Sequence, residues 1–451
     1  MSHVIAALST GNVLSAIGIL RLSGDGAVEV ASKVFRAKNG KNLTEYPNHR
    51  MILGHLLDTK GRVLDEILAV VARGPHSYTG EDTVEFQCHG SPAVLAEGLS
   101  ALFQAGARQA TAGEFTKRAF LSGNLDLTQA EAVIDLIHAE TAEQAANAAG
   151  QLGGAILSKI DPIYTDLTQI CSHFHAVLDY PDEDIEDFQL VAFQGQIAEG
   201  IATLSQFLES FQRGKILKSG ISTVILGKPN AGKSSLLNAL AGFDRAIVTD
   251  IEGTTRDAVT ETVRLGDRTL RLTDTAGIRE TLDPIEAIGI AKAEQAAGDA
   301  DLALLVLDGS RPLSPEDFRV LAAAEQVPKV IALVNKGDLS PAFDPGELPL
   351  EALAISAKKS TGLDKLEEKV GQMFPTDGNY DGSILTNTRQ AEAITRAKSA
   401  LENAQNSMAG HTPDAVLMDV EEAMSALGEL TGRTVREDIT ADIFARFCVG
   451  K

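Results

Sequence analysis

The chain has 451 residues and a formal net charge of −22, and its 44% hydrophobic and 23% charged residues are typical of a folded protein. This length exceeds one ordinary domain, so two or three domains are expected. The acidic balance argues against a protein that holds nucleic acid by itself, because phosphate contacts need a basic face. The sequence lacks the ~18 consecutive apolar residues of a membrane helix. Its three cysteines have no paired spacing, which favours a reduced, cytoplasmic protein.

Four segments with three different patterns follow one another along the chain. Residues 1–119 alternate short β-rich runs with turns and a few helices, which indicates an α+β domain. Residues 120–214 carry apolar side chains at helical spacing, and residues 379–451 return to that pattern. Residues 215–378 repeat a strand, loop and helix pattern, which predicts a mostly parallel sheet. The expected fold is therefore multidomain α/β, with this sheet domain inserted into a helical domain.

Individual elements can be predicted within these segments from apolar periodicity. The expected strands are Val4–Leu8, Ala16–Leu22, Leu64–Val71, Val224–Leu226, Leu270–Thr273, Leu302–Leu307 and Val330–Val334, and the expected helices include Glu131–His138, Ile156–Leu178 and Ser235–Ala241.

A phosphate-binding loop is predicted directly after the strand Val224–Leu226. Residues Gly227–Ser234 read GKPNAGKS, which matches the P-loop pattern in full and precedes the expected helix. Its glycines let backbone N–H groups face phosphates, Lys233 can reach the β and γ phosphates, and Ser234 can ligate Mg²⁺. A chance Gly-rich turn is a poor alternative, because the strand and the helix are both in place.

Three later segments follow predicted strands and complete a nucleotide site. Asp274–Gly277 reads DTAG, a place for a Mg²⁺-linked carboxylate and a γ-phosphate sensor. Asn335–Asp338 reads NKGD, and an Asp carboxylate there can accept both N–H groups of guanine, which adenine lacks. Ser356–Lys358 reads SAK and can place a backbone N–H near the guanine oxygen. Alone, NKGD is equally a polar turn or a helix cap, but the series of segments favours GTP.

This order of segments resembles the translation-factor-like class of GTPases, with a Ras-like, P-loop domain. The resemblance implies a first switch at 249–257, in which Thr255 joins Ser234 on Mg²⁺ when the γ-phosphate is present. The predicted nucleotide ligands are Asn230, Ala231, Gly232, Lys233, Ser234, Ser235, Thr249, Asp250, Ile251, Glu252, Gly253, Thr254, Thr255, Asp274, Thr275, Ala276, Gly277, Asn335, Lys336, Asp338, Ser356, Ala357 and Lys358.

Hydrolysis would need an unusual arrangement, because Ile278 stands where Ras-like enzymes have a water-orienting Gln. By resemblance, a K⁺ ion held by Asn230, Thr249, Ile251 and Thr254 replaces an arginine finger, and Lys233 is a catalytic residue. Glu280, Asp283 and Glu286 are candidates to position water, and the resemblance selects Glu286. The alternative for Glu286 is a solvated acid at the start of a helix.

Motifs outside this domain identify a family. They include Ile19-Leu20-Arg21, Tyr78–Asp82, Gly113–Phe120, Asp126–Ala132 and the terminal Phe447–Lys451, and they closely resemble the MnmE (TrmE) tRNA-modification GTPases over essentially the whole length. The resemblance implies modification of carbon five of the wobble uridine of certain tRNAs. It also implies a tetrahydrofolate one-carbon donor, a homodimer built on the N-terminal domain, and a heterotetramer with the flavoprotein MnmG. In that assembly tRNA is bound mainly with the partner, and no membrane is involved.

The same resemblance assigns folate contacts to Arg21, Glu85 and Lys451, and to Asn124 in place of the family's usual Lys. Asn keeps a donor but loses the positive charge that would pair with an anionic folate tail. Cys448 is a further candidate catalytic residue. The alternatives are a strand-edge cation for Arg21, a solvated acid for Glu85 and a structural thiol for Cys448.

Other readings remain open at this point. A ribosome-assembly GTPase would need a KH module or a second GTPase unit, and neither is recognisable after Phe374; a regulatory switch leaves the terminal Cys-x-Gly-Lys unexplained. Cys171 and His175 share a helical face, with His173 nearby, but two ligands do not make a metal site. The acidic run Asp182–Asp187 is interpreted as a solvated loop, with a metal cluster as a minor alternative.

Overall fold

The computed structural model describes residues 3–179, 187–243, 261–272, 300–375, 380–410, 413–434, 443–445 and 447–450. These residues fall into two compact units, which are described separately. The first comprises Met1–Ile137, Gln151–Leu204 and Glu392–Lys451, and the second comprises His138–Gly150 and Ser205–Ala391. No helix among the described ranges combines the length and apolar character needed to cross a membrane.

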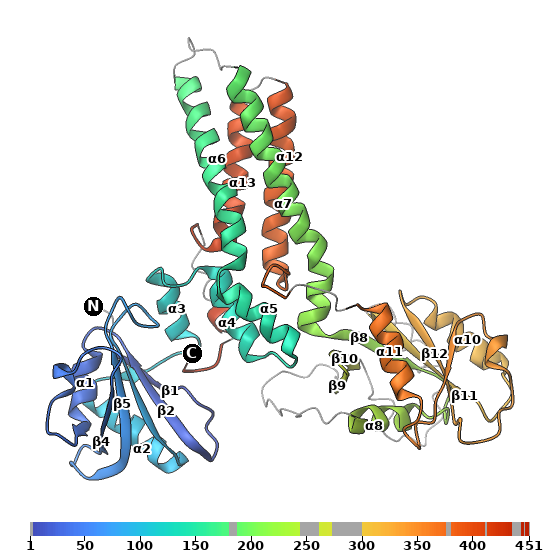
Figure 1. The fold of residues 1–451 in the computed structure, drawn as a ribbon, viewed down its shortest axis with the longest axis horizontal. Helices are drawn as coiled ribbons and strands as arrows, with labels where there is room; N and C mark the ends of the chain where they lie inside the picture. The colour runs from blue at the N-terminus through green and yellow to red at the C-terminus, as the bar shows by residue number, and fades with distance from the viewer. Residues whose placement is uncertain are drawn as a thin grey trace. The chain divides into compact units, whose positions relative to one another are not determined.

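The N-terminal part of the first unit is a sheet with the strand order β3-β4-β5-β6-β2-β1-β7, antiparallel except for the β1–β7 pair (Figure 1). Its apolar side chains alternate between faces, as in strands buried on one side. One face packs against α1 and α2 through residues such as Leu20, Phe86 and Leu102. The other buries Phe115 of α3 against Ile5. The strands are β1 (Ile5–Leu8), β2 (Ser15–Ser23), β3 (Phe35–Ala37), β4 (Met51–Leu57), β5 (Val63–Ala72), β6 (Thr83–Gly90) and β7 (Arg108–Gln109), and the helices are α1 (Ala27–Lys33), α2 (Pro92–Ala105), α3 (Glu114–Leu121) and η1 (Leu43–Glu45).

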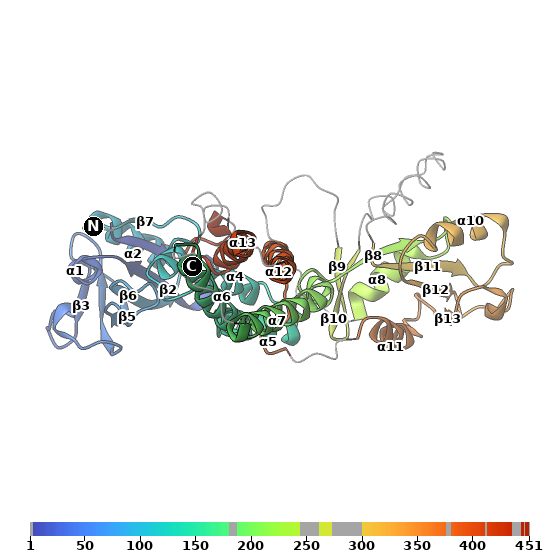
Figure 2. The ribbon, with the colours of Figure 1, turned by 90° about the horizontal axis from the view of Figure 1, so that it is seen from above.

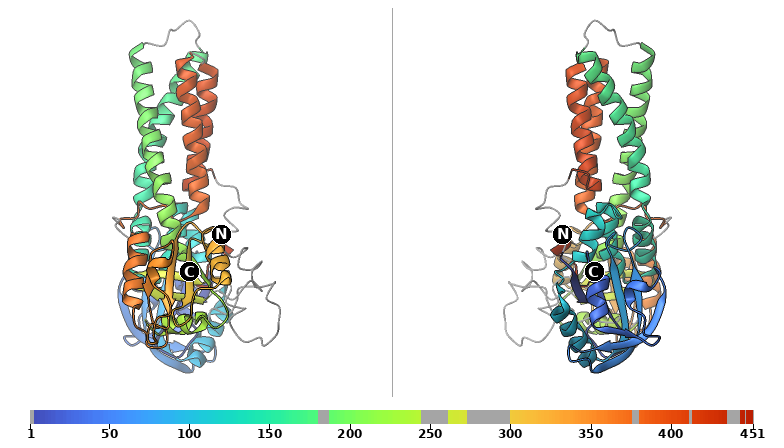
Figure 3. Two further views of the ribbon diagram at one scale, coloured as in Figure 1. Left: turned by 90° about the vertical axis from the view of Figure 1, so that its right-hand side faces the viewer. Right: turned by 90° about the vertical axis from the view of Figure 1, so that its left-hand side faces the viewer.

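Long helices make up the rest of the first unit. In α6, apolar residues recur every three or four positions from Ile156 to Phe174, and all of them are buried. α13 buries a matching stripe that includes Val420 and Leu427. Figure 3 shows α6, α7, α12 and α13 running side by side. The bounds are α4 (Leu127–Ile137), α6 (Ala155–Asp179), α7 (Asp187–Ser219), α12 (Thr388–Ala409) and α13 (Pro413–Thr431), and α7 and α12 each include residues of the second unit.

The second unit is built on a sheet of order β13-β12-β11-β8-β10-β9, in which only β9 and β10 pair antiparallel. α8 and α11 share one apolar core with the sheet, and α10 packs in a second core on the other face (Figure 2). The strands are β8 (Ile221–Leu226), β9 (Glu261–Leu265), β10 (Arg268–Leu272), β11 (Leu302–Asp308), β12 (Val330–Asn335) and β13 (Ala352–Ala354), and the helices are α5 (Ala142–Leu152), α8 (Lys233–Phe243), α10 (Pro315–Ala324), α11 (Leu363–Met373) and η2 (Pro345–Glu347).

The predicted fold class is confirmed: an α+β domain, a helical domain and an inserted α/β domain with a mostly parallel sheet. Because β8, β11 and β12 are parallel neighbours, their carboxyl ends lie at one edge of the sheet. That edge is where ligands bind in open α/β sheets.

Candidate functional site

The loop between β8 and α8 has the backbone that a phosphate cradle requires. Gly227 has φ 154°, Asn230 has φ 64° and Gly232 has φ 103°, so the chain curls tightly before α8 begins at Lys233. The Lys233 ammonium donates to the carbonyl of Gly227 at 2.6 Å and to that of Lys228 at 2.9 Å. Burial lowers the pKa of Lys233. A partly buried cation over a curled backbone is suited to binding an anion.

Asn335 joins three of the predicted segments. At the end of β12 this residue is 3% exposed. Its amide nitrogen donates to the carbonyl of Ala231 in the loop at 3.0 Å, and its amide oxygen accepts from the backbone N–H of Ala357 at 2.9 Å. Residues separated by more than a hundred positions are thereby fixed at one site. Asn335 therefore orients the nucleotide segments, a role that its place in the motif alone does not show.

Asp338 is held in place by Ser356, whose hydroxyl donates to Oδ1 at 2.7 Å. That hydrogen bond is the main cause of a lowered Asp338 pKa, so the group is a carboxylate at neutral pH. Lys336, at φ 65°, forms an ion pair with Asp308 at 2.7 Å. We call the hydrogen bonds of Asn335 to Ala231 and Ala357 the Asn335 junction. A fixed carboxylate beside it provides the paired acceptor that a guanine base needs.

A second group of predicted ligands gathers in the N-terminal domain. The Arg21 guanidinium donates to the Glu85 carboxylate at 2.7 Å across the β2–β6 pair, and a second nitrogen lies 3.4 Å from the Gly450 carbonyl. The ring centroids of Tyr78 and Phe115 each lie 5.6 Å from the Arg21 guanidinium carbon. Phe115 is fully buried and supports Arg21 from inside the domain, whereas Tyr78 is exposed. The site thus combines one ion pair with one accessible aromatic ring, a surface suited to a flat, polar heterocycle.

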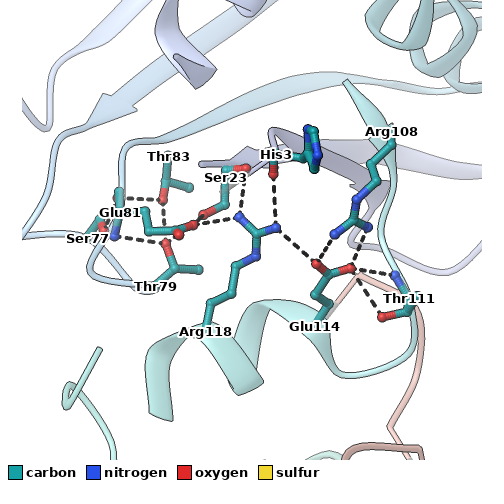
Figure 4. A network of polar contacts seen from close by, with 10 residues as sticks. All are labelled: His3, Ser23, Ser77, Thr79, Glu81, Thr83, Arg108, Thr111, Glu114 and Arg118. Carbon is teal, nitrogen blue, oxygen red and sulfur yellow. Dashed lines mark hydrogen bonds and ion pairs between the residues drawn. The ribbon is translucent and has the colours of Figure 1, made fainter. Parts of the chain in front are cut away.

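A network of charged side chains ties α3 to the loop before β6 (Figure 4). Arg118 donates to Glu81 at 2.7 Å and to Glu114 at 3.0 Å, and Arg108 also contacts Glu114. Burial alone would raise the pKa of Glu114, but hydrogen bonds from Arg108, the Thr111 backbone and Arg118 outweigh it and hold the pKa at about 2. The network fixes the loop that carries Tyr78 toward Arg21.

Comparisons with known proteins identify the family of the chain. The model of the MnmE helical domain matches residues 127–448, and the model of the GTP-binding protein TrmE N-terminus matches residues 4–124. The tRNA modification GTPase MnmE of Symbiobacterium thermophilum is 43% identical over 462 residues, covering 100% of this chain and 99% of the relative. The MnmE of Heliobacterium modesticaldum is 42% identical, with 100% of both chains covered. The chain belongs to the MnmE family.

This membership makes the chain a tRNA modification GTPase and confirms the predicted family. Among solved structures, the G domain of the T. maritima FeoB iron transporter is 27% identical over 34% of this chain and 97% of its own, with a TM-score of 0.26. The family assignment does not depend on that partial likeness.

Several MnmE-type residues predicted above lie outside the described part of the chain. These are the first-switch residues Thr249, Asp250, Ile251, Glu252, Gly253, Thr254 and Thr255, the DTAG residues Asp274, Thr275, Ala276 and Gly277, the candidate water-positioning residues Glu280, Asp283 and Glu286, and the terminal Lys451. The acidic positions 182–186 are also outside it. Their roles stay predictions.

Asn124, the departure from the MnmE family pattern, faces the loop before β6. Its amide nitrogen donates to the carbonyl of Ser77 at 2.9 Å and lies 3.4 Å from that of Tyr78. Both acceptors are backbone carbonyls of this loop. Asn124 therefore stabilises the backbone at Tyr78, one of the residues beside Arg21.

The C-terminal tail returns to the N-terminal domain. Val449 forms a β-bridge with Ala112, and the Cys448 carbonyl accepts from the Gly113 N–H at 3.3 Å. The Cys448 side chain is exposed, so it is open to reagents, whereas Cys88 lies in the core and burial raises its pKa to about 12. Of the two thiols, only Cys448 is placed to react.

Sequence reasoning missed three residues at these sites. Lys228 lies inside the P-loop motif, but its ammonium forms an ion pair with the Asp317 carboxylate of α10 at 2.6 Å. This ion pair anchors the loop to α10. Asp308 restrains Lys336 from the end of β11. Tyr78 belongs to a family motif but had no assigned role. An aromatic side chain in the otherwise polar loop Ser77–Asp82 is the signal from which its role in the site could have been predicted.

Proposed function

We propose that this MnmE-family chain is a K⁺-stimulated GTP hydrolase. Working with the flavoprotein MnmG, it forms the aminomethyl-type modification at carbon five of the wobble uridine of certain tRNAs. It acts in the cytoplasm as a homodimer, within a heterotetramer that binds tRNA mainly through the partner. The observation that carries the proposal is the Asn335 junction, which unites the phosphate loop with the guanine-recognition segments in a chain whose relatives are named tRNA modification GTPases.

GTP binding uses charge and backbone geometry at the sheet edge. Lys233 gives up its two carbonyl partners to contact the β and γ phosphates, which replaces neutral acceptors by charged ones. Ser234 would supply its hydroxyl to Mg²⁺, and Thr255 would be the second protein ligand. Asp338, already oriented by Ser356, accepts the two guanine N–H groups.

Hydrolysis without an arginine finger needs another positive charge near the transferred phosphate. Asn230 is exposed in the left-handed conformation at the crest of the loop, so its side-chain oxygen is accessible to a cation. Together with Thr249, Ile251 and Thr254 it forms the proposed K⁺ site, and Glu286 positions water. Hydrolysis is expected to be much faster in K⁺ than in Na⁺, and equal rates would remove this role from Asn230.

The Arg21 site is the proposed place for a tetrahydrofolate derivative, which supplies a one-carbon unit when bound. Arg21, Glu85 and Lys451 would hold its polar groups, and the exposed Tyr78 ring beside Arg21 would be available to contact it. Asn124 acts by bracing the loop at Tyr78. Cys448 stands exposed on the tail that contacts this site through Gly450, where it is a candidate catalytic thiol.

The decisive test is nucleoside analysis of tRNA from a strain that lacks this protein. The C5-modified wobble uridine should disappear, return with the wild-type chain, and stay absent with Lys233→Ala expressed at the same level. Unchanged nucleosides in the deletion strain would overturn the proposal. If they were accompanied by a ribosome-subunit defect, they would indicate a ribosome-assembly GTPase instead.

A further inference from the structure

Two neighbouring helices of the first unit bring together three side chains of different ligand types. Cys171 and His175 stand one turn apart on α6, so both project from the same face of the helix. Glu421 projects from α13, which packs against that helix. One sulfur, one imidazole nitrogen and one carboxylate oxygen from these residues lie within 4.8 Å of one another.

The distances are close to those of a metal's coordination shell. In a tetrahedral zinc site the bonds of about 2.0–2.3 Å separate neighbouring ligand atoms by roughly 3.3–3.6 Å. His175 Nε2 lies 3.1 Å from Glu421 Oε1, so this pair already spans one edge of such a tetrahedron. Their side chains are 54% and 51% exposed. The Cys171 sulfur lies within 4.8 Å of both atoms, and side-chain rotation would have to shorten that separation for all three to share one ion.

We propose that Cys171, His175 and Glu421 form a binding site for Zn²⁺ or a similar borderline divalent ion, with water as the fourth ligand. The ligand set decides the class of metal. A thiolate and an imidazole favour Zn²⁺ and later first-row ions, whereas Mg²⁺ and Ca²⁺ take oxygen ligands. The site is separate from the nucleotide site, whose residues all belong to the second unit.

The site would join parts of the chain that are distant in sequence. α6 precedes the inserted GTPase domain and α13 follows it, so an ion shared by Cys171, His175 and Glu421 cross-links the two halves of the helical domain. Because binding would occur only when the helices are packed, the ion would stabilise the folded domain by mass action. The proposed role is structural, and hydrolysis of GTP does not depend on it.

The test uses the full-length, untagged protein, because a polyhistidine tag would itself bind the ion. After chelator treatment, the protein is titrated with Zn²⁺ by calorimetry in Mg²⁺ buffer, and with Co²⁺ by absorption. Binding at one site per chain is expected, with a sulfur-to-cobalt charge-transfer band. Cys171→Ser should abolish that band and Glu421→Gln should weaken Zn²⁺ binding at least tenfold, while both variants keep wild-type helical content and GTPase rate.

Two matched controls separate this site from other metal-binding groups. Glu422→Gln removes the adjacent exposed carboxylate of α13, and Cys448→Ser removes the exposed thiol of the tail; both should bind like the wild type. Absence of a charge-transfer band in the wild type would overturn the proposal. So would a band that survives Cys171→Ser, or Zn²⁺ affinity that Glu421→Gln leaves unchanged. Any of these would reduce the cluster to a His175–Glu421 ion pair beside a bystander thiol.

Discussion

Single side chains decide how the nucleotide segments meet. Asn335 is buried, and both ends of its amide are hydrogen-bonded to backbone groups of other segments. A buried amide group left without a hydrogen bond lowers the free energy of unfolding by about 1–3 kcal/mol, so the loss of either bond would destabilise the site. The same amide leaves no room for a side chain at Gly232, because a Cβ built there would lie 2.1 Å from the Asn335 amide nitrogen. Asn335 and Gly232 are therefore mutually required.

Gly232→Ala tests this dependence. Gly232 has φ 103°, where a side chain is strained, and the added methyl group would displace Asn335 from the Ala231 carbonyl. GTP affinity should fall at least tenfold, about 1.4 kcal/mol, when measured by titration with a fluorescent GTP analogue. Gly242→Ala is the matched control, since nothing lies within 4 Å of its Cβ on α8. Its affinity should be unchanged, and an equal loss in both variants would contradict the role of Gly232.

Base specificity is argued at Asp338. Asp338→Asn keeps the contact with Ser356 but replaces one acceptor by a donor, so guanine loses a partner and xanthine, with an oxygen at that position, gains one. Hydrolysis should shift at least a hundredfold from GTP toward xanthosine triphosphate in competition assays. Asp344→Asn changes a carboxylate that caps η2 in the same unit and should keep GTP preference. Retained guanine selectivity in Asp338→Asn would refute the assignment of this residue.

At the scale of elements, the sequence predicts best where one pattern has one structural solution. The apolar runs Leu302–Leu307 and Val330–Val334 are the strands Leu302–Asp308 and Val330–Asn335, because a strand buried on both faces has few other forms. Ile156–Leu178 is within the helix Ala155–Asp179. The prediction of the loop before α8 also holds, since its glycines have the positive φ values that the motif requires.

Contacts between distant elements could not be predicted in this way. Local patterning contains no information that Asn335 bonds to Ala231, or that Lys228 leaves the phosphate side of its loop for Asp317. Arg21 and Glu85 were selected through the family resemblance, and only the antiparallel β2–β6 register places them opposite each other. Periodicity shows which face of an element is buried. Which residues of distant elements contact each other depends on the tertiary fold of the whole chain.

The charged network of α3 predicts a pH dependence. The pKa of Glu114 is about 2 in the folded chain, below its ordinary value of 4.5, so its contribution to stability is complete above pH 4.5 and is lost as the pH falls toward 2. Glu114→Gln should therefore destabilise the N-terminal domain by about 2 kcal/mol at pH 7. The difference in the free energy of unfolding between the variant and the wild type should decrease steadily from pH 4.5 to pH 2.5.

Hydrogen-exchange protection of the β6 backbone, compared at the same pH for Glu114→Gln and the wild type, measures this difference without requiring the whole chain to unfold in one step. Glu97→Gln, an exposed carboxylate on α2, serves as the control and should match the wild type throughout. A difference that stays constant down to pH 2.5 would show that Glu114 acts through packing and not through its charge.

At the scale of the whole molecule, the last described residues close the N-terminal site. The Gly450 carbonyl accepts from the Ser9 hydroxyl at 2.9 Å and lies 3.4 Å from an Arg21 nitrogen, so residues far apart in the sequence share one site. Between them in sequence stand the helical domain and the GTPase domain. Gly450 can therefore reach Arg21 only after the domains between them in sequence have been made.

Gly450→Ala tests whether this closure matters. Gly450 has φ 104°, and a Cβ there would lie 2.2 Å from the Leu8 carbonyl oxygen, so the tail should detach from the β1–β2 connection. Hydrogen exchange near Ser9 should increase, and affinity for a tetrahydrofolate derivative should fall at least tenfold, with GTP affinity unchanged. Gly40→Ala carries the same backbone strain at φ 78° with nothing within 4 Å, and should leave both readouts at wild-type values. Faster exchange with unaltered folate affinity would separate tail docking from ligand binding and move the folate site away from the Gly450 carbonyl.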